Sequence, residues 1–179
     1  PPRVTRAAEL LPKLNIDPGL ALDLTTVDET GRPWDFSKRD MREKARGKFR
    51  RERPDLLVGS PMCTLYSAWN HLNKTRDISA YRRRLRDARV HLEFVCELYL
   101  EQHNAGRLFL HEHPAGASSW DERCVQEMLK LLGVSTTITD QGPSEQRSRE
   151  GNPTLKPTKW MSNSDDILKA LSKRCTGKG

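Results

Sequence analysis

The chain has 179 residues, of which 35% are hydrophobic and 31% are charged, so it can bury a core and is not a disordered segment. Lysine and arginine exceed aspartate and glutamate by 31 − 24 = 7, which suits a polyanionic partner. No apolar run approaches the roughly 20 residues that cross a bilayer, so no membrane partner is expected. The four cysteines lie far apart without a CxxC pair, which favours reduced thiols in an intracellular protein.

Four segments are expected before residue 37. Apolar residues at helical spacing predict a helix over residues 4–14. Residues 20–24 have the apolar pattern of a short buried strand, with Asp23 near its end. Residues 28–33 are typical of a turn, and residues 34–36 are interpreted as the edge of the next strand.

A strongly basic helix is predicted from about Ser37 to Arg53. Its cations lie around most of its circumference, so that Met41, Ala45 and Phe49 are left as an inward stripe. Two interpretations are open: a solvated outer helix, and a helix that faces the phosphates of a nucleic acid.

Strands and helices alternate in the rest of the chain. Strands are expected over residues 55–59, 107–111, 134–139 and 156–161, and helices over 81–103, 121–132 and 164–175. Alternation without a hairpin signal predicts an α/β fold, namely a Rossmann-like, mostly parallel sheet with helices on both faces. A single domain over residues 1–179 is expected, with a mobile loop over 140–155.

Reactive side chains follow two of these strands, at the edge where α/β sheets bind ligands. Cys63 lies in a Ser-Pro-x-Cys turn after strand 55–59, a position that favours a thiolate nucleophile over an inert buried thiol. Glu112 lies between His111 and His113 at the end of the next strand. The two histidines share one face of the strand and Glu112 the other, so a metal site lacks a third ligand. We expect Glu112 and Cys63 to meet at adjacent strand ends.

Two motifs resemble those of C5-cytosine methyltransferases. Residues 54–67 (Pro-Asp-Leu-Leu-Val-Gly-Ser-Pro-Met-Cys-Thr-Leu-Tyr-Ser) are similar to the catalytic Pro-Cys motif of that family. Residues 109–114 (Phe-Leu-His-Glu-His-Pro) resemble its Glu-Asn-Val motif, and Glu112 matches the catalytic glutamate. The same stretches are similar to methyltransferase-like segments of eukaryotic retroelement polyproteins.

This resemblance implies a fold of the S-adenosylmethionine-dependent methyltransferase type, in partial or truncated form. It implies a cytosine of a nucleic acid as substrate, DNA rather than RNA, and a nuclear location if the source is eukaryotic. Cys63 and Glu112 would be the catalytic residues. The resemblance also implies residues that would contact S-adenosylmethionine, namely Asp23, Asp35, Ser60 and Pro61, and residues that would contact nucleic acid, namely Arg147, Arg149 and Lys156.

The chain departs from the family pattern in several places. The glycine-rich first motif is absent, Met62 replaces a proline, Thr64 a glutamine and His113 an asparagine. Because glycines let a cofactor approach the backbone, we expect these 179 residues to transfer methyl groups slowly or not at all. The alternative function is a non-catalytic nucleic-acid-binding or scaffold module derived from the same fold, such as a segment of a mobile-element polyprotein.

Overall fold

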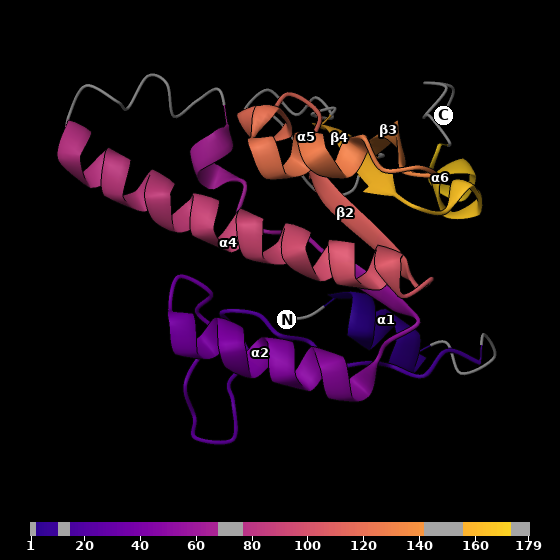
Figure 1. The fold of residues 1–179 in the computed structure, drawn as a ribbon, viewed down its shortest axis with the longest axis horizontal. Coiled ribbons are helices and arrows are strands. Elements are labelled where there is room, and N and C mark those ends of the chain that lie inside the picture. The colour runs from indigo at the N-terminus through magenta and orange to yellow at the C-terminus, as the bar shows by residue number, and fades with distance from the viewer. Residues whose placement is uncertain (1–2, 11–14, 68–76, 142–155, 173–179) are drawn as a thin grey trace, which may run out of the picture. The chain divides into compact units, whose positions relative to one another are not determined.

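The computed structural model describes residues 3–10, 15–67, 77–141 and 156–172. The chain forms two compact units, residues 1–54 and 55–179, and each is described by itself (Figure 1). The expectation of one domain stays a prediction, because two compact units can belong to one folding domain. The loop expected to be mobile lies outside the described residues from residue 142 onwards.

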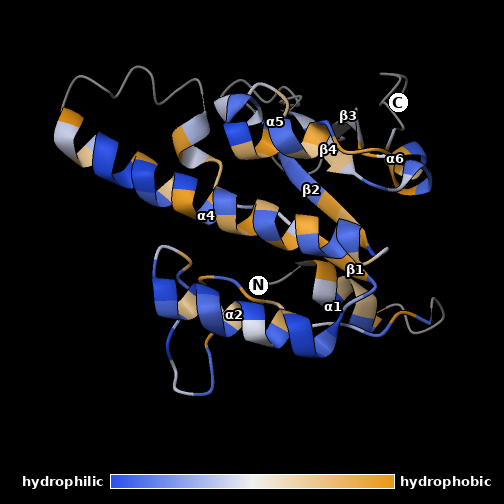
Figure 2. Cartoon of the chain, viewed as in Figure 1, coloured by the Kyte–Doolittle hydropathy of each residue, from blue (hydrophilic) through white to orange (hydrophobic). Residues whose placement is uncertain are grey.

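Two helices are described in unit 1 (residues 1–54). α1 (Arg3–Leu10) confirms the first part of the helix predicted over residues 4–14. α2 (Arg39–Glu52) confirms the basic helix, and Met41, Ala45 and Phe49 are its buried residues, as predicted. Figure 2 shows α2 as largely hydrophilic outside this stripe.

The two strands predicted in unit 1 are wrong. Residues 20–24 form a loop in which the side chains of Leu20 and Leu24 are exposed. The hydroxyl of Thr26 donates to the carbonyl of Ala21, and the amide of Thr26 donates to the carbonyl of Asp23, so this segment bonds to itself. Residues 34–36 form no strand either. An apolar pattern does not reveal whether a partner strand lies alongside, and a strand needs that partner for its backbone hydrogen bonds.

Unit 2 (residues 55–179) is built on a four-stranded mixed sheet in the order β1-β2-β4-β3. The strands are β1 (Leu56–Gly59), β2 (Leu108–Pro114), β3 (Ser135–Gln141) and β4 (Lys156–Ser162). They confirm the four strands predicted after residue 54 and the α/β class. β1 and β2 are parallel, with Gly59 paired to His111.

The prediction of a mostly parallel sheet is wrong for the strands described. β4 runs antiparallel to both of its neighbours, β2 and β3, so one pairing of three is parallel. The prediction relied on the absence of two-residue hairpin turns, and that absence does not exclude antiparallel pairing of strands such as β3 and β4, which are separated by a longer segment. Mixed sheets occur in doubly wound folds too. The Rossmann-like arrangement therefore stays a prediction.

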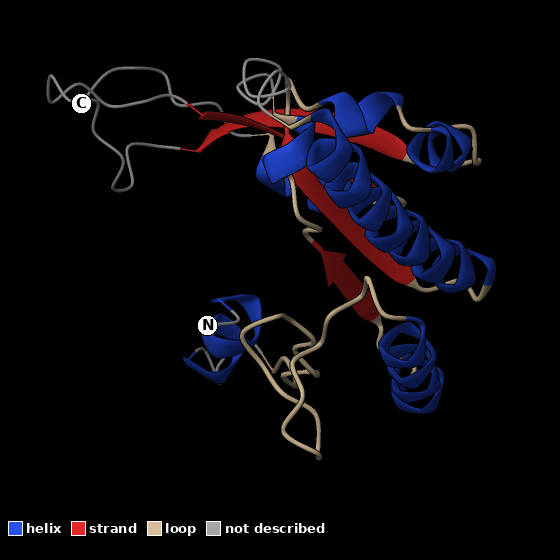
Figure 3. Ribbon diagram, turned by 90° about the vertical axis from the view of Figure 1, so that its left-hand side faces the viewer, coloured by secondary structure: helices blue, strands red, loops and turns tan. Residues whose placement is uncertain are grey.

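A long helix packs along the sheet of unit 2. α4 (Ile78–Asn104) confirms the helix predicted over residues 81–103 and lies beside the strands in Figure 3. It begins at Asp77, whose carboxylate accepts a 2.9 Å hydrogen bond from the amide of Ala80. Its buried side chains form the core with Phe109 and Met161 of the sheet. No helix within the described residues is long and apolar enough to cross a membrane.

In the described residues after β2, the helices are short. The helix predicted over residues 121–132 is divided into a 3-10 turn, η3 (Ser118–Asp121), and α5 (Arg123–Leu129). α6 (Asp165–Leu171) confirms the last helix, and the hydroxyl of Ser164 accepts a hydrogen bond from the amide of Ile167 at its start. Its predicted continuation to residue 175 extends beyond the described residues.

Candidate functional site

The two motifs meet at the carboxyl ends of β1 and β2. Because Gly59 pairs with His111 in parallel register, the next residues, Ser60 and Glu112, lie side by side. Oγ of Ser60 donates a 2.5 Å hydrogen bond to Oε2 of Glu112. This bond ties the turn that contains Cys63 to the strand that carries Glu112.

His113 holds the same turn from the protein interior. Its Nε2 lies 2.7 Å from the carbonyl oxygen of Pro61, and its Nδ1 lies 2.5 Å from Oγ of Ser119. A carbonyl can only accept, so Nε2 carries the proton and Ser119 donates its hydroxyl to Nδ1. Burial lowers the pKa of His113, although the Pro61 carbonyl and the charge of Glu112 oppose this shift. The neutral ring is therefore the form that holds the turn.

His111 faces the core on the same side of β2 as His113. Its Nδ1 lies 3.1 Å from Oη of Tyr99, and both side chains are fully buried. Burial lowers the pKa of His111 and raises that of Tyr99, so both groups are neutral. Gly59 makes room for this pair, because a Cβ at that position would collide with Oη of Tyr99.

Metal ligation receives no support from this arrangement. The imidazole rings of His111 and His113 are 4.9 Å apart between centroids, and Glu112 bonds to Ser60 instead of joining them. Within the part of the chain that the structure describes, no three His, Cys, Asp or Glu side chains gather as a metal ion would require.

Cys63 lies in the turn after β1, directly before the 3-10 helix η2 (Thr64–Tyr66). Its carbonyl accepts a 3.0 Å hydrogen bond from the amide of Tyr66, and its side chain is half-buried. The buried side chains of Leu65 and Tyr66 anchor the turn to the core. The Cys63 thiol is thus held at the end of β1 without being sealed in the interior.

The two acids that the resemblance assigns to the cofactor lie in turns of unit 1. Oδ1 of Asp23 accepts hydrogen bonds of 2.7 Å from both the amide and the hydroxyl of Thr25. Oδ1 of Asp35 accepts a 3.0 Å hydrogen bond from the amide of Ser37, just before α2. Both carboxylates therefore have a local structural role in the described turns.

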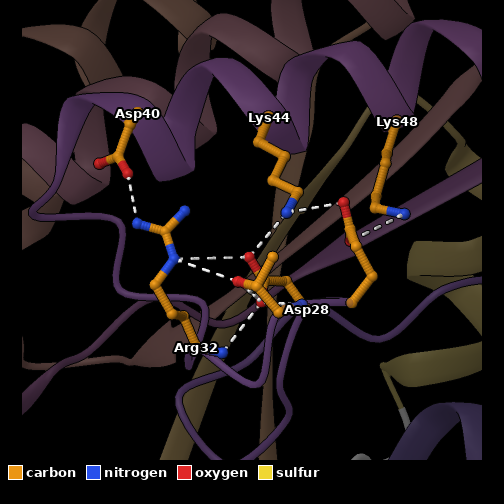
Figure 4. A network of polar contacts seen from close by, with 7 residues as sticks. Asp28, Arg32, Asp40, Lys44 and Lys48 are labelled. Carbon is orange, nitrogen blue, oxygen red and sulfur yellow. Dashed lines mark hydrogen bonds and ion pairs between the residues drawn. The ribbon is translucent and has the colours of Figure 1, made fainter.

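The buried carboxylate of Asp28, in the turn predicted over residues 28–33, organises unit 1 (Figure 4). Oδ1 of Asp28 accepts from the amides of Thr30 and Arg32, and Oδ2 lies 2.7 Å from Nζ of Lys44 on α2. The hydrogen bonds from Lys44 and then Thr30 hold the pKa of Asp28 well below its usual range. An Asp that precedes Thr and Gly signals a local turn. It does not reveal a partner 16 residues later.

The residues predicted to contact nucleic acid are described only in part. Arg147 and Arg149 lie outside the described residues, and Lys156 begins β4, where it pairs with Gln141. On α2, Lys44 forms ion pairs with Asp28 and Glu29, so part of the helix charge is balanced within unit 1. Both interpretations of this basic helix stay open.

A cavity of about 370 Å³ lies beside the two motifs. One lining residue belongs to the Pro-Cys motif, most of the others follow the glutamate motif along the chain, and one lies on β4. They are Tyr66, Ala115, Gly116, Ala117, Ser118, Trp120, Asp121 and Lys159. Nζ of Lys159 lies 4.5 Å from the centroid of the Trp120 ring. Aromatic walls and a cation suit a flat or anionic ligand, but Cys63 and Glu112 are not among the lining residues.

No protein-family model, curated protein or solved structure matches this chain. The functional interpretation therefore depends on the residues of the chain and their geometry.

Proposed function

We propose that the chain is a nucleic-acid C5-cytosine methyltransferase-like domain in which Cys63 is a covalent nucleophile and Glu112 acts on the same base. One observation carries the proposal, the hydrogen bond between Ser60 and Glu112 at the ends of two paired parallel strands. It joins the Pro-Cys turn to the glutamate motif across 52 positions of sequence. The ends of parallel strands are where α/β sheets bind their ligands.

The chemistry begins with attack on the base. The Cys63 thiolate adds to C6 of cytosine and forms an S–C6 bond, while Glu112 stabilises protonation at N3. The electron pair of the former C5=C6 double bond becomes available at C5, as in an enamine. C5 then forms a bond to an electrophile, which is a proton from water when no methyl donor is present. Loss of the original C5 proton, together with departure of the thiolate from C6, restores the aromatic ring. The base reaches the thiol only from a single strand or after leaving the duplex stack.

Neighbouring side chains position these two groups. His113 holds the carbonyl of Pro61, two residues before Cys63, and thereby restrains the turn. Ser60 bonds to one oxygen of Glu112. A carboxylate has two oxygens, so the other is available to a base.

S-adenosylmethionine stays in the proposal as the methyl donor, which would supply an electrophilic methyl group to C5. The described residues do not fit a preformed cofactor site, because the four residues assigned to it bond within their own turns or to the neighbouring motif: Asp23, Asp35, Ser60 and Pro61. Methyl transfer by these residues is therefore expected to be slow or absent.

The alternative is an intracellular nucleic-acid-binding or scaffold module that lost catalysis. The occupied carboxylates of Asp23 and Asp35 favour it, because a cofactor would have to displace their turn hydrogen bonds. For the methyltransferase-like domain and for a nucleic-acid-binding module alike, the proposed partner is nucleic acid, DNA rather than RNA. Covalent chemistry at Cys63 distinguishes the methyltransferase-like domain from the non-catalytic module, because a module that only binds needs no thiolate.

A trapping experiment tests the proposal. An oligonucleotide that contains 5-azacytosine, whose ring nitrogen makes C6 more electrophilic, is incubated with the reduced protein, and the adduct is mapped by peptide mass spectrometry. We expect an adduct on Cys63, none in Cys63→Ser, and a rate lowered roughly 10²-fold in Glu112→Gln. Cys124→Ser removes a thiol outside the site and should trap like the parent. Binding without any adduct on Cys63 would favour the non-catalytic module.

A further inference from the structure

Four arginines lie close together near the start of α4, and we call them the arginine cluster. They are exposed and form no ion pair with any acid in the described part of the chain: Arg82, Arg83, Arg84 and Arg86. The next cation along the helix differs, because Nε of Arg89 lies 2.8 Å from Oε1 of Glu122. Figure 2 shows these turns of α4 as mainly hydrophilic.

The arginine cluster covers the solvent side of the helix. Ala88 belongs to the core cluster of unit 2, and Tyr81 and Leu85 pack against it, which identifies the side of α4 that faces the interior. With 3.6 residues per turn, Arg83 and Arg86 point away from that side, and the other two arginines lie on either flank. The cluster is therefore presented outwards by a helix whose opposite side is anchored in the core.

The cluster repels itself, and nearby acids offset this repulsion only in part. Arg82 and Arg86 are four residues apart, a spacing at which like charges destabilise a helix. Asp87 is the one acid within residues 82–87, which therefore carry a net charge of 4 − 1 = 3. The carboxylate of Asp77, just before α4, accepts a hydrogen bond from the amide of Ala80 instead. A bound polyanion would relieve the repulsion.

The other basic helix, α2, is balanced to a larger degree by its own unit. Nε of Arg39 lies 2.8 Å from Oε1 of Glu43, and Lys44 forms ion pairs with Asp28 and Glu29. A cation that already holds a carboxylate has to release it before it can bind a phosphate. Of the two helices, α4 therefore offers a cluster of charges that an external polyanion can bind without breaking an ion pair.

We propose that the arginine cluster of α4 binds the phosphates of a nucleic acid and positions the strand for the proposed site. A guanidinium group is always charged and can bind two phosphate oxygens at once. α4 contacts η2, which directly follows Cys63, so a strand held on α4 lies on the helix that supports the Pro-Cys turn. Phosphate contacts fix position and do not read bases. This inference rests on the proposed nucleic-acid partner and assigns its docking face.

The test compares two variants of the full chain that have the same formal net charge, 7 − 3 = 4. One variant carries three changes in the cluster: Arg82→Gln, Arg83→Gln and Arg86→Gln. The control carries three changes at exposed arginines that pair with acids: Arg39→Gln, Arg51→Gln and Arg123→Gln. Fluorescence anisotropy with a labelled DNA oligonucleotide measures the affinity of each variant at several salt concentrations.

We expect the cluster variant to bind roughly 10²-fold more weakly than the parent at about 100 mM salt, and its slope of log affinity against log salt to be shallower by about 3, because each phosphate contact contributes roughly 0.9. The control variant should bind nearly like the parent. Glutamine is a strong helix former and removes the repulsion, so the melting temperature of the cluster variant should not fall. Arg83→Gln alone should lose affinity where Arg123→Gln alone does not, which tests the assignment with one exposed change.

Two results would overturn the assignment to α4: equal losses of affinity in the two triple variants, or binding like that of the parent by the cluster variant. Neither result bears on Cys63, whose trapping by 5-azacytosine in the parent tests the proposed function separately. Binding of the parent to phosphatidylserine vesicles, without any binding to the oligonucleotide, would also overturn the proposal, because the cluster would then serve an anionic membrane surface.

Discussion

At the scale of single residues, His113 determines the geometry of the Pro-Cys turn most directly. It bonds to Pro61 on one side and Ser119 on the other, and it is fully buried. The alternation of a strand predicts that His111 and His113 share a face. It does not predict the contact of His113 with Pro61, because that contact depends on the parallel register of β1 against β2.

Replacing His113 with alanine should destabilise unit 2 by about 2–5 kcal/mol, because the Pro61 carbonyl and the Ser119 hydroxyl would be left buried without partners, beside a cavity. His113→Asn is the matched control, since its amide can both donate and accept hydrogen bonds. It should lose less stability than His113→Ala. Urea unfolding measures both variants. A loss well below 1 kcal/mol in His113→Ala would mean that the turn does not depend on this side chain.

The buried histidines should also make stability fall in mild acid. Their folded-state pKa values are lowered, whereas an unfolded histidine titrates near 6.5, so the unfolded chain binds protons that the native chain does not. The contribution of the neutral histidines to the free energy of unfolding is fully present above about pH 6.5. It declines as the pH falls from there towards the folded pKa values, by up to about 1.4 kcal/mol per pH unit for each histidine. Urea unfolding between about pH 7.5 and 5.5 should show this decline, less steep in His113→Asn. A flat profile in the parent would contradict neutral histidines.

At the scale of elements, β1 approaches α4 so closely that residue 59 has to be glycine. A Cβ there would collide with Oη of Tyr99 and crowd Val95. Gly59→Ala should therefore cost about 1–3 kcal/mol through overpacking. Gly47→Ala is the control, because a Cβ at Gly47 of α2 meets nothing within 4 Å and should stabilise the helix by about 0.5–1 kcal/mol. Equal stabilities for Gly59→Ala and the parent in chemical unfolding would show that Tyr99 moves aside freely.

The turn of unit 1 should depend on Asp28 far more than on Asp40, an exposed acid of the same network. Asp28 is buried and accepts from two backbone amides and Lys44, while Asp40 pairs with Arg32 in solvent. We expect Asp28→Asn to lower the melting temperature clearly and Asp40→Asn to lower it little. Because the folded pKa of Asp28 is lowered, its stabilisation is present above the unfolded value near 3.8 and is lost as the pH falls through the folded value. Similar melting temperatures for the two variants would refute this ranking.

Elements with a strong local pattern were predictable, and those that depend on distant partners were not. Helical spacing of apolar residues located α2 and α4, and continuous apolar runs located β1 and β2. The strand predicted over residues 20–24 failed because Thr26 closes a local turn there. The position of β4 between β2 and β3 was missed, since strand order is set by long-range pairing.

In the candidate site too, features with a local sequence pattern were predictable, and features that depend on distant partners were not. Adjacent strand ends led us to expect that Glu112 would lie near the Pro-Cys turn, and the bond to Ser60 has that geometry. The contacts of His113 and the room that Gly59 leaves for Tyr99 have no local signal in the sequence. Each joins residues whose proximity arises only after the sheet and α4 have packed.

At the scale of the whole molecule, the net charge of +7 predicts salt-sensitive binding to nucleic acid. If about four phosphates are neutralised, the affinity should fall roughly 10²-fold between about 50 and 200 mM salt, because condensed counterions are released. Fluorescence anisotropy with a labelled oligonucleotide measures this slope. Cys63→Ser should bind like the parent, since a thiol contributes little to phosphate contacts. Affinity that does not change with salt would argue against a nucleic-acid partner.

The central claim is that Cys63 and Glu112 act on one cytosine ring. Addition of the Cys63 thiolate to C6 makes C5 basic, so C5 takes a proton from water and loses its original hydrogen when the thiolate departs. Release of tritium from an oligonucleotide labelled at C5 of cytosine therefore measures this step without any methyl donor. The account predicts release by the parent, none above background by Cys63→Ser, and release lowered roughly 10²-fold in Glu112→Gln. Equal release by the parent and Cys63→Ser, or no release by a parent saturated with oligonucleotide, would contradict it.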